Sequence, residues 1–139
     1  MMLYINGSDI ARLTIGVVAD DRASFSIEPK TFQVRPEDYL FTIDAWLHEH
    51  CIEIASISSL VMVIGPGSAT ALRTSLAWAN TFAFTQSIPT YGVELAVGSD
   101  DRAVLIGIAS MDSLPMLRPI YANAPTITAT KKDALRRNL

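Results

Sequence analysis

The sequence predicts an α/β fold built on a mixed β-sheet, and three observations lead to this class. Short apolar runs joined by polar turns open the chain over residues 3–27, as is typical of antiparallel strands. An apolar run at 60–64 then passes through a Gly-Pro-Gly-Ser turn into a helical pattern. Another apolar run at 91–93 follows that helix, and a strand–helix–strand order predicts a right-handed parallel crossover.

Composition indicates one globular domain, since half of the 139 residues are apolar and 18% are charged. Apolar runs fall short of the roughly 20 residues that span a bilayer. Cys51 has no second cysteine to pair with, so we expect a cytoplasmic protein that makes no contact with a membrane. The net charge of −3 is not that of a nucleic-acid binder, although residues 131–139 carry four cations against Asp133.

The opening third predicts an antiparallel meander of three strands. Turn residues separate its apolar runs, and a Glu-Pro-Lys triplet ends it at 28–30. The expected strands are residues 3–5, 10–18 and 23–27, with turns at 6–9 and 20–21.

A first helix is predicted over 36–51. Pro36 suits the first helical position, and two acidic residues follow it in the first turn, where the helix dipole favours negative charge. Its apolar residues recur at helical spacing: Leu40, Ile43, Leu47 and Cys51, flanked by Tyr39 and Trp46.

A second helix is predicted over 69–86, and small side chains recur along it every four residues. Such a stripe lets another helix or a sheet approach closely. Apolar residues surround the stripe, so we expect burial on more than one side, either on the sheet alone or on the sheet and a partner. The stripe is Ala71, Ser75, Ala79 and Ala83, and Leu72, Leu76, Trp78, Phe82 and Phe84 surround it.

Beyond the fifth strand the pattern predicts a sixth strand at 103–108. Prolines at 115, 119 and 125 then favour an extended segment lying on the body. We therefore expect a lobe over 1–110 and an extended C-terminal segment with a basic tail over 111–139.

The Gly-Pro-Gly-Ser turn is the strongest local motif. Its glycines, Gly65 and Gly67, allow backbone angles that a side chain would forbid, and Ser68 or Thr70 can cap the following helix. Exposed N–H groups at such a turn can bind an anion. Spacing alone favours a structural turn over a phosphate cradle, because Pro66 and its neighbours lack the Gly-Lys-Ser/Thr of a Walker loop.

Other candidates for chemistry are weaker, and we predict neither catalytic residues nor a metal site. His48 and His50 are two residues apart and point to different sides of a helix, whereas a helical zinc pair needs a spacing of four. Ser68 lacks the Gly-x-Ser-x-Gly elbow of a nucleophile. The Asp pairs at 20–21 and 100–101 sit in turns, where Asp is common.

The loop and its helix resemble those of the TsaB (YeaZ) family, once labelled glycoprotease-like. The family's loop usually reads Gly-Pro-Gly-Ser-Phe-Thr-Gly-Leu-Arg, and this chain has Ala69 in place of the Phe and Ala71 in place of the last Gly. The resemblance implies the N-terminal lobe of the actin, Hsp70 and RNase H-like (ASKHA) fold, with a reduced second lobe. The matching residues are Gly65, Pro66, Gly67, Ser68, Thr70, Leu72 and Arg73.

That resemblance implies a non-catalytic subunit for threonylcarbamoyladenosine synthesis in tRNA. Family members pair with the catalytic subunit TsaD, associate with the ATPase TsaE and form homodimers, and we expect this chain to meet tRNA only indirectly. The expected interface comprises Tyr39, Ile43, Trp46, Leu72, Arg73, Ser75, Leu76, Ala79, Phe82 and Ala83.

The alternative that the sequence leaves open is an ATPase or phosphotransferase that uses the loop at 65–68. Against it, the family's first strand usually ends in Asp-Thr-Ser, whereas Asn6 stands here at the acidic position. An amide lacks the charge that Mg²⁺ prefers. We therefore expect no cofactor, with ATP and Mg²⁺ required only by the alternative.

Overall fold

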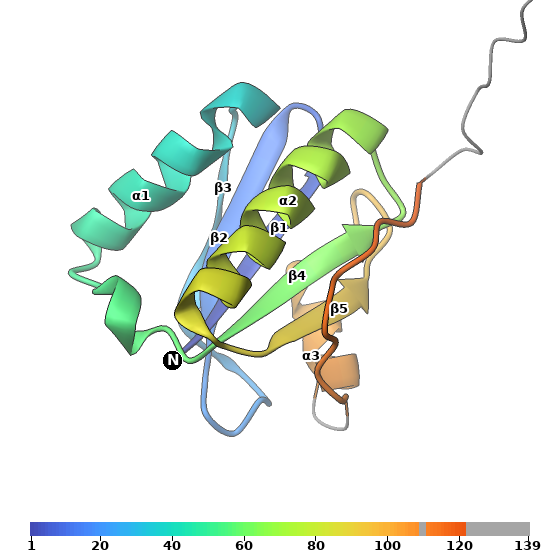
Figure 1. Cartoon of the computed structure of the whole chain (residues 1–139). Coiled ribbons are helices and arrows are strands. Elements are labelled where there is room, and N and C mark those ends of the chain that lie inside the picture. Colours follow the sequence, from blue (N-terminus) through green and yellow to red (C-terminus); the bar gives the residue numbers. More distant parts are fainter. Residues whose placement is uncertain (109–110, 122–139) are drawn as a thin grey trace, which may run out of the picture.

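The computed structural model describes residues 1–108 and 111–121, and its centre is a five-stranded mixed sheet in the order β3-β2-β1-β4-β5 (Figure 1). Two long helices cover one face, and a short helix lies against the other. The strands are β1 (Met2–Asp9), β2 (Arg12–Val18), β3 (Phe25–Phe32), β4 (Ser59–Gly65) and β5 (Thr90–Glu94). The helices are η1 (Pro36–Asp38), α1 (Tyr39–Glu49), η2 (Ile54–Ser56), α2 (Ala69–Gln86), η3 (Asp101–Ala103) and α3 (Val104–Ile108).

Strand β1 joins the antiparallel and parallel halves of the sheet. It pairs antiparallel with β2 and parallel with β4, and β4 in turn pairs parallel with β5. The predicted mixed sheet, with its meander and its crossover through α2, is therefore confirmed.

Strands β1 and β3 are longer than predicted, whereas β2 begins at Arg12, two residues after its predicted start. Strand β1 continues through the expected turn to Asp9, so the reversal lies at residues 10–11. Strand β3 likewise continues past Pro29 to Phe32. Proline cannot donate to a strand ladder, but β3 is the edge strand of the sheet, where one side of the backbone needs no partner.

Successive side chains of each strand point to opposite faces of the sheet, and each face has its own hydrophobic core. On β1, Leu3 and Ile5 point towards α1 and α2, whereas Met2 and Tyr4 point to the opposite face, towards α3. Both faces of the central strands are thus covered, which explains the unbroken apolar run of β4.

The buried face of α1 is turned relative to the prediction. Leu40 is 63% exposed and Cys51 is also exposed, while Tyr39, Ile43 and Trp46 are buried. Helical spacing alone allowed either the stripe that contains Leu40 or the one that contains Tyr39 to face the sheet, because the residues of both stripes recur every three or four positions. Pro36 begins the short helix η1 rather than α1 itself.

The sixth strand predicted at 103–108 is wrong, because this segment forms η3 and α3. Val104 and Ile108, one helical turn apart, are 3% and 0% exposed against the second face of the sheet. A short apolar run does not distinguish a strand from a buried helix.

Helix α2 spans the predicted residues 69–86 and ends at Ser87 in the left-handed conformation. Among the described residues, no helix combines the length and the apolar character that crossing a membrane requires.

Candidate functional site

The glycine loop, residues 65–68, connects the end of β4 to the start of α2 (Figure 1). It contains a cis peptide bond between Gly65 and Pro66. Ser68 is the N-cap of α2, since its side chain accepts a hydrogen bond from the Ala71 N–H at 3.4 Å. Of the two expected caps, the structure therefore selects Ser68, and Thr70 lies exposed in the first helical turn.

The two glycines are required by close backbone contacts. A Cβ atom on Gly67 would collide with the backbone oxygen of Ser8, to which Ser68 N–H donates at 2.9 Å. Gly65 has a φ of 128°, and a Cβ atom there would collide with the backbone oxygen of Ile120. The chain itself therefore fills the space on both sides of the loop.

Residues 113–121, which we call the strap, run along α2 and over the glycine loop. The Ile120 N–H donates to the Ile64 oxygen at 2.7 Å, and Tyr121 forms a β-bridge with Gly67. At the other end of the strap, the Leu114 N–H donates to the Thr90 backbone oxygen of the edge strand β5 at 2.8 Å, and the Thr90 hydroxyl donates to the Leu114 oxygen at 2.8 Å.

Asn80 clamps the middle of the strap. Its Nδ2 donates to the Leu117 oxygen at 3.0 Å, and its Oδ1 accepts from the Leu117 N–H at 2.9 Å. The carboxamide thus replaces the two partners that a neighbouring strand would offer. Sequence reasoning missed Asn80, because an amide on a helix has no motif until its partner segment is known.

Arg73 also contacts the strap. Its Nε donates to the Tyr121 hydroxyl at 3.4 Å, and its guanidinium carbon lies 5.7 Å from the centre of that ring. This contact gives a partner to the cation of Arg73, the fifth residue of α2, near the helix end at which the dipole is unfavourable to positive charge.

A polar cluster lies on the other face of the sheet, at the end of β1. The Tyr4 hydroxyl donates to Asp101 Oδ1 at 2.5 Å, and Asn6 Nδ2 donates to the same oxygen at 3.3 Å. Asn6 Oδ1 accepts from the Ser8 hydroxyl at 2.6 Å. Burial, with Asp101 adding to it, raises the pKa of the Tyr4 phenol far above its ordinary value, so Tyr4 remains a donor.

Asn6 and Asp101 line a cavity of about 150 Å³ next to this cluster. Asp101 thus places a carboxylate beside Asn6, the residue that stands where the TsaB family usually has an aspartate. Asp101 belongs to the Asp pair at 100–101 that the sequence predicts to lie in a turn, but no sequence signal links it to β1. Within residues 1–108 and 111–121, no three His, Cys, Asp or Glu side chains gather as metal ligands would.

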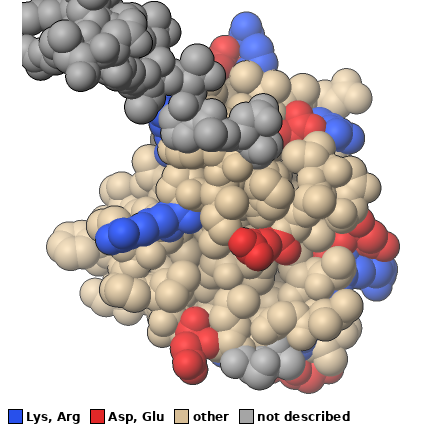
Figure 2. Space-filling model, turned by 90° about the vertical axis from the view of Figure 1, so that its right-hand side faces the viewer, with Lys and Arg blue, Asp and Glu red and all other residues tan. Residues whose placement is uncertain are grey.

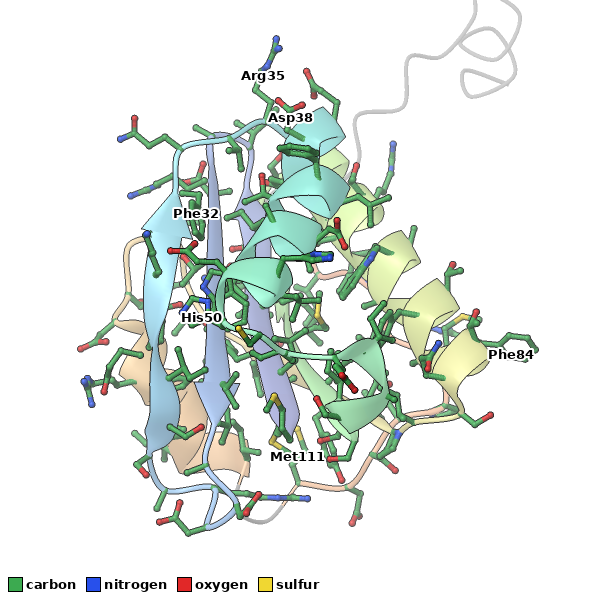
Figure 3. The ribbon with its side chains drawn as sticks, turned by 90° about the vertical axis from the view of Figure 1, so that its left-hand side faces the viewer. Phe32, Arg35, Asp38, His50, Phe84 and Met111 are labelled. Atoms are coloured by element: carbon green, nitrogen blue, oxygen red, sulfur yellow. The ribbon has the colours of Figure 1, made fainter. Side chains whose placement is uncertain are left out.

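Both histidines bind the backbone of their own helix region. His48 Nδ1 lies 2.9 Å from the Asp44 oxygen, and His50 Nδ1 lies 2.9 Å from the Trp46 oxygen. The His50 ring also packs on Trp46, with 4.2 Å between ring centres. These contacts give each histidine a structural partner, and Figure 3 labels His50 beside the end of α1.

The residues expected at a partner interface lie mostly inside the molecule. The small-residue stripe packs α2 on its own sheet, which corrects the expected assignment of those residues to a partner surface. Arg73 is exposed and Phe82 is half-buried. The eight buried residues are Tyr39, Ile43, Trp46, Leu72, Ser75, Leu76, Ala79 and Ala83.

Comparison with protein families gives a match over residues 37–98 to the family TsaD, tRNA N6-adenosine threonylcarbamoyltransferase. This stretch contains α1, β4, the glycine loop, α2 and β5. The family match and the fold match agree with the resemblance drawn from the loop: residues 37–98 are similar to the TsaD family, and the fold is similar to that of YeaZ.

The fold match rests on two solved structures from Pseudomonas aeruginosa. YeaZ superposes with a TM-score of 0.56 at 14% identity, over 67% of this chain and 43% of that chain. A protein with similarity to peptidase YeaZ gives a TM-score of 0.54 at 14% identity, over 67% of this chain and 42% of that chain. The chain thus spans less than half of their length, and no curated protein matches it in sequence.

Proposed function

We propose that this chain is a non-catalytic subunit of the machinery that makes threonylcarbamoyladenosine in tRNA, and that it docks on a TsaD-like enzyme. The observation that carries the proposal is the family match over 37–98, which coincides with the two helices and the loop between them. The YeaZ-like fold supports the same assignment.

The filled glycine loop supports a non-catalytic role. A phosphate would need the space over the loop that the Ser8 and Ile120 backbones occupy, and the Ser68 N–H already donates to Ser8. The ATPase alternative therefore requires the strap to move first. Calorimetry of the whole chain with Mg-ATP separates the two functions, because tight binding would favour the alternative.

We propose that docking uses the outer side of the helix layer rather than the buried residues named from the sequence. Leu40 and Phe41 of α1 are 63% and 77% exposed, and Trp78 and Phe82 of α2 are half-buried with stacked rings 5.2 Å apart. These four residues, the helix flank, offer apolar area whose burial contributes about 25 cal/mol per Å². A TsaE-like ATPase and a homodimer remain further proposals for the same assembly.

Co-purification tests this surface. The full chain is expressed with the TsaD-like protein of the same source, and complex formation is quantified by size-exclusion chromatography. We expect Leu40→Asp combined with Phe41→Asp to reduce binding at least tenfold. Ile106→Asp is the matched control, because Ile106 is 85% exposed on α3, across the sheet from the helix flank.

Unchanged binding by the double variant would reject the helix flank as the interface. Absence of any complex with the native chain would reject the proposed function itself. Circular dichroism of each variant verifies that its fold is intact.

A further inference from the structure

Helix α1 presents an outer face that the rest of the described chain leaves uncovered. Leu40 and Phe41 are 63% and 77% exposed on it, although side chains of these types usually lie inside a folded protein. Asp44 is also exposed and follows them by one helical turn, which places its Cβ atom about 5–6 Å from theirs. The exposed apolar pair of the helix flank therefore adjoins a carboxylate, and any molecule that covers the pair must accommodate that charge.

The charge along α1 has one sign. Between Arg35 and Arg73 the chain contains no Lys or Arg, yet it contains five carboxylates, and all five are exposed. The side of the molecule that carries β5 and α3 differs, because Lys or Arg side chains are visible there as well as Asp or Glu (Figure 2). The five carboxylates lie on η1, on α1 and just before η2: Glu37, Asp38, Asp44, Glu49 and Glu53.

The molecule itself offsets little of this negative charge. Arg35 Nε lies 3.2 Å from Glu37 Oε1 at the start of α1, where Figure 3 labels Arg35 and Asp38. His48 Nδ1 lies 3.6 Å from Asp44 Oδ1, and the two form an ion pair only when the imidazole is protonated. In the described part of the chain, the other three carboxylates form no ion pair. A partner that approaches α1 therefore meets a negative potential.

We propose that the outer face of α1 binds a surface of the TsaD-like enzyme on which Lys or Arg side chains surround apolar ones. The inference rests on the proposed function and adds the chemistry of the partner's contact surface. Apolar groups of the partner cover Leu40 and Phe41, and its cations meet the carboxylates around them. A second copy of this chain fits less well, because two α1 helices would bring like charges together. The phosphates of an RNA are repelled for the same reason.

This arrangement has a kinetic consequence. Charges at the rim of an interface act mainly on the rate of association. Opposite charges attract the partner from a distance, and dissolved salt screens that attraction beyond about 8 Å at physiological ionic strength. The association rate constant should therefore fall steeply as salt is added, whereas the apolar contacts keep the dissociation rate nearly constant.

Charge reversal on the full chain tests the proposal. Asp44→Lys combined with Glu49→Lys reverses two carboxylates of α1. Glu94→Lys combined with Asp112→Lys is the matched control, because it changes the net charge equally at two exposed positions on β5 and just before the strap. Association with the TsaD-like protein of the same source is followed by surface plasmon resonance at several salt concentrations. We expect the α1 variant to associate about tenfold more slowly at low salt and to lose the salt dependence, and the control to stay within about twofold of the native rate.

Two kinetic results would overturn the proposal and leave the proposed function intact. One is an unchanged rate and an unchanged salt dependence in the α1 variant. The other is an equal slowing in the control, because net charge would then govern association instead of the face of α1. Absence of binding by the native chain would reject the proposed function, and the inference with it.

Two further measurements complete the test. Circular dichroism verifies the fold of each variant, and Asp44→Asn with Glu49→Gln replaces an unfolded reversal, with an expected slowing of about threefold. Sedimentation of the native chain alone detects a second copy on this face. A dimer that Leu40→Asp with Phe41→Asp converts to a monomer would overturn the proposal in favour of that copy.

Discussion

Replacing Asn80 by Ala tests how the strap is held over the glycine loop. The substitution removes both hydrogen bonds to the backbone of Leu117, which is 3% exposed. A hydrogen bond contributes about 1 kcal/mol, and a buried group left without a partner costs about 1–3 kcal/mol. We therefore expect Asn80→Ala to lower the free energy of unfolding by about 2–4 kcal/mol.

Urea unfolding measures that loss, and hydrogen exchange locates it. The Leu117 and Ile120 amides donate to Asn80 Oδ1 and to the Ile64 oxygen, so both should exchange faster in the variant. Thr81→Ala, at an exposed neighbouring position of α2, is the control and should change stability by less than about 0.5 kcal/mol. A loss below about 0.5 kcal/mol in Asn80→Ala, with unchanged exchange at Leu117, would refute the clamp.

Three further substitutions probe other parts of the account. Tyr4→Phe removes the donor to Asp101 and should cost about 1.5–3 kcal/mol in urea unfolding; a neutral result would mean that α3 is held by packing alone. Ser87→Gly should raise the melting temperature, because Ser87 has a φ of 55° at the end of α2 and glycine relieves about 1 kcal/mol of strain there. A lower melting temperature would contradict this conformation. Asp9 accepts hydrogen bonds from the Ala11 N–H and from Arg12, which hold its pKa below its ordinary value. The resulting stability is present above that ordinary value and is lost as the pH falls through the lowered pKa in the folded state. The Asp9→Asn variant should therefore have a lower free energy of unfolding near neutral pH and lose less of it as the pH falls. The same loss in acid as in the native chain would count against the hydrogen bonds of Asp9 with Ala11 and Arg12.

The architecture could be predicted because its signals are local. Apolar periodicity located the two long helices, and the short polar turns indicated an antiparallel meander. The glycine loop could be predicted as a structural turn from its residues alone. Gly65 and Gly67 each lie against a backbone oxygen at a distance that only glycine tolerates.

Errors arose where tertiary contacts decide the structure. The apolar run at 103–108 is compatible with a strand or a helix. It forms a helix because Val104 and Ile108 then pack together against the second face of the sheet. The small-residue stripe of α2 is likewise compatible with packing on a sheet or on a partner, and in the structure it packs on the sheet of its own chain. Asn80, Asp101 and Tyr121 are brought to their partners by segments distant in the sequence, so no local pattern could identify their roles.

The central claim is that this chain completes a TsaD-like enzyme instead of carrying out chemistry itself. The most direct measurement is the amount of threonylcarbamoyladenosine formed in tRNA by that enzyme with and without the full chain. We predict that the chain raises the yield, and that Leu40→Asp with Phe41→Asp abolishes the increase while Ile106→Asp preserves it. The same yield in the presence and absence of the native chain would contradict the account.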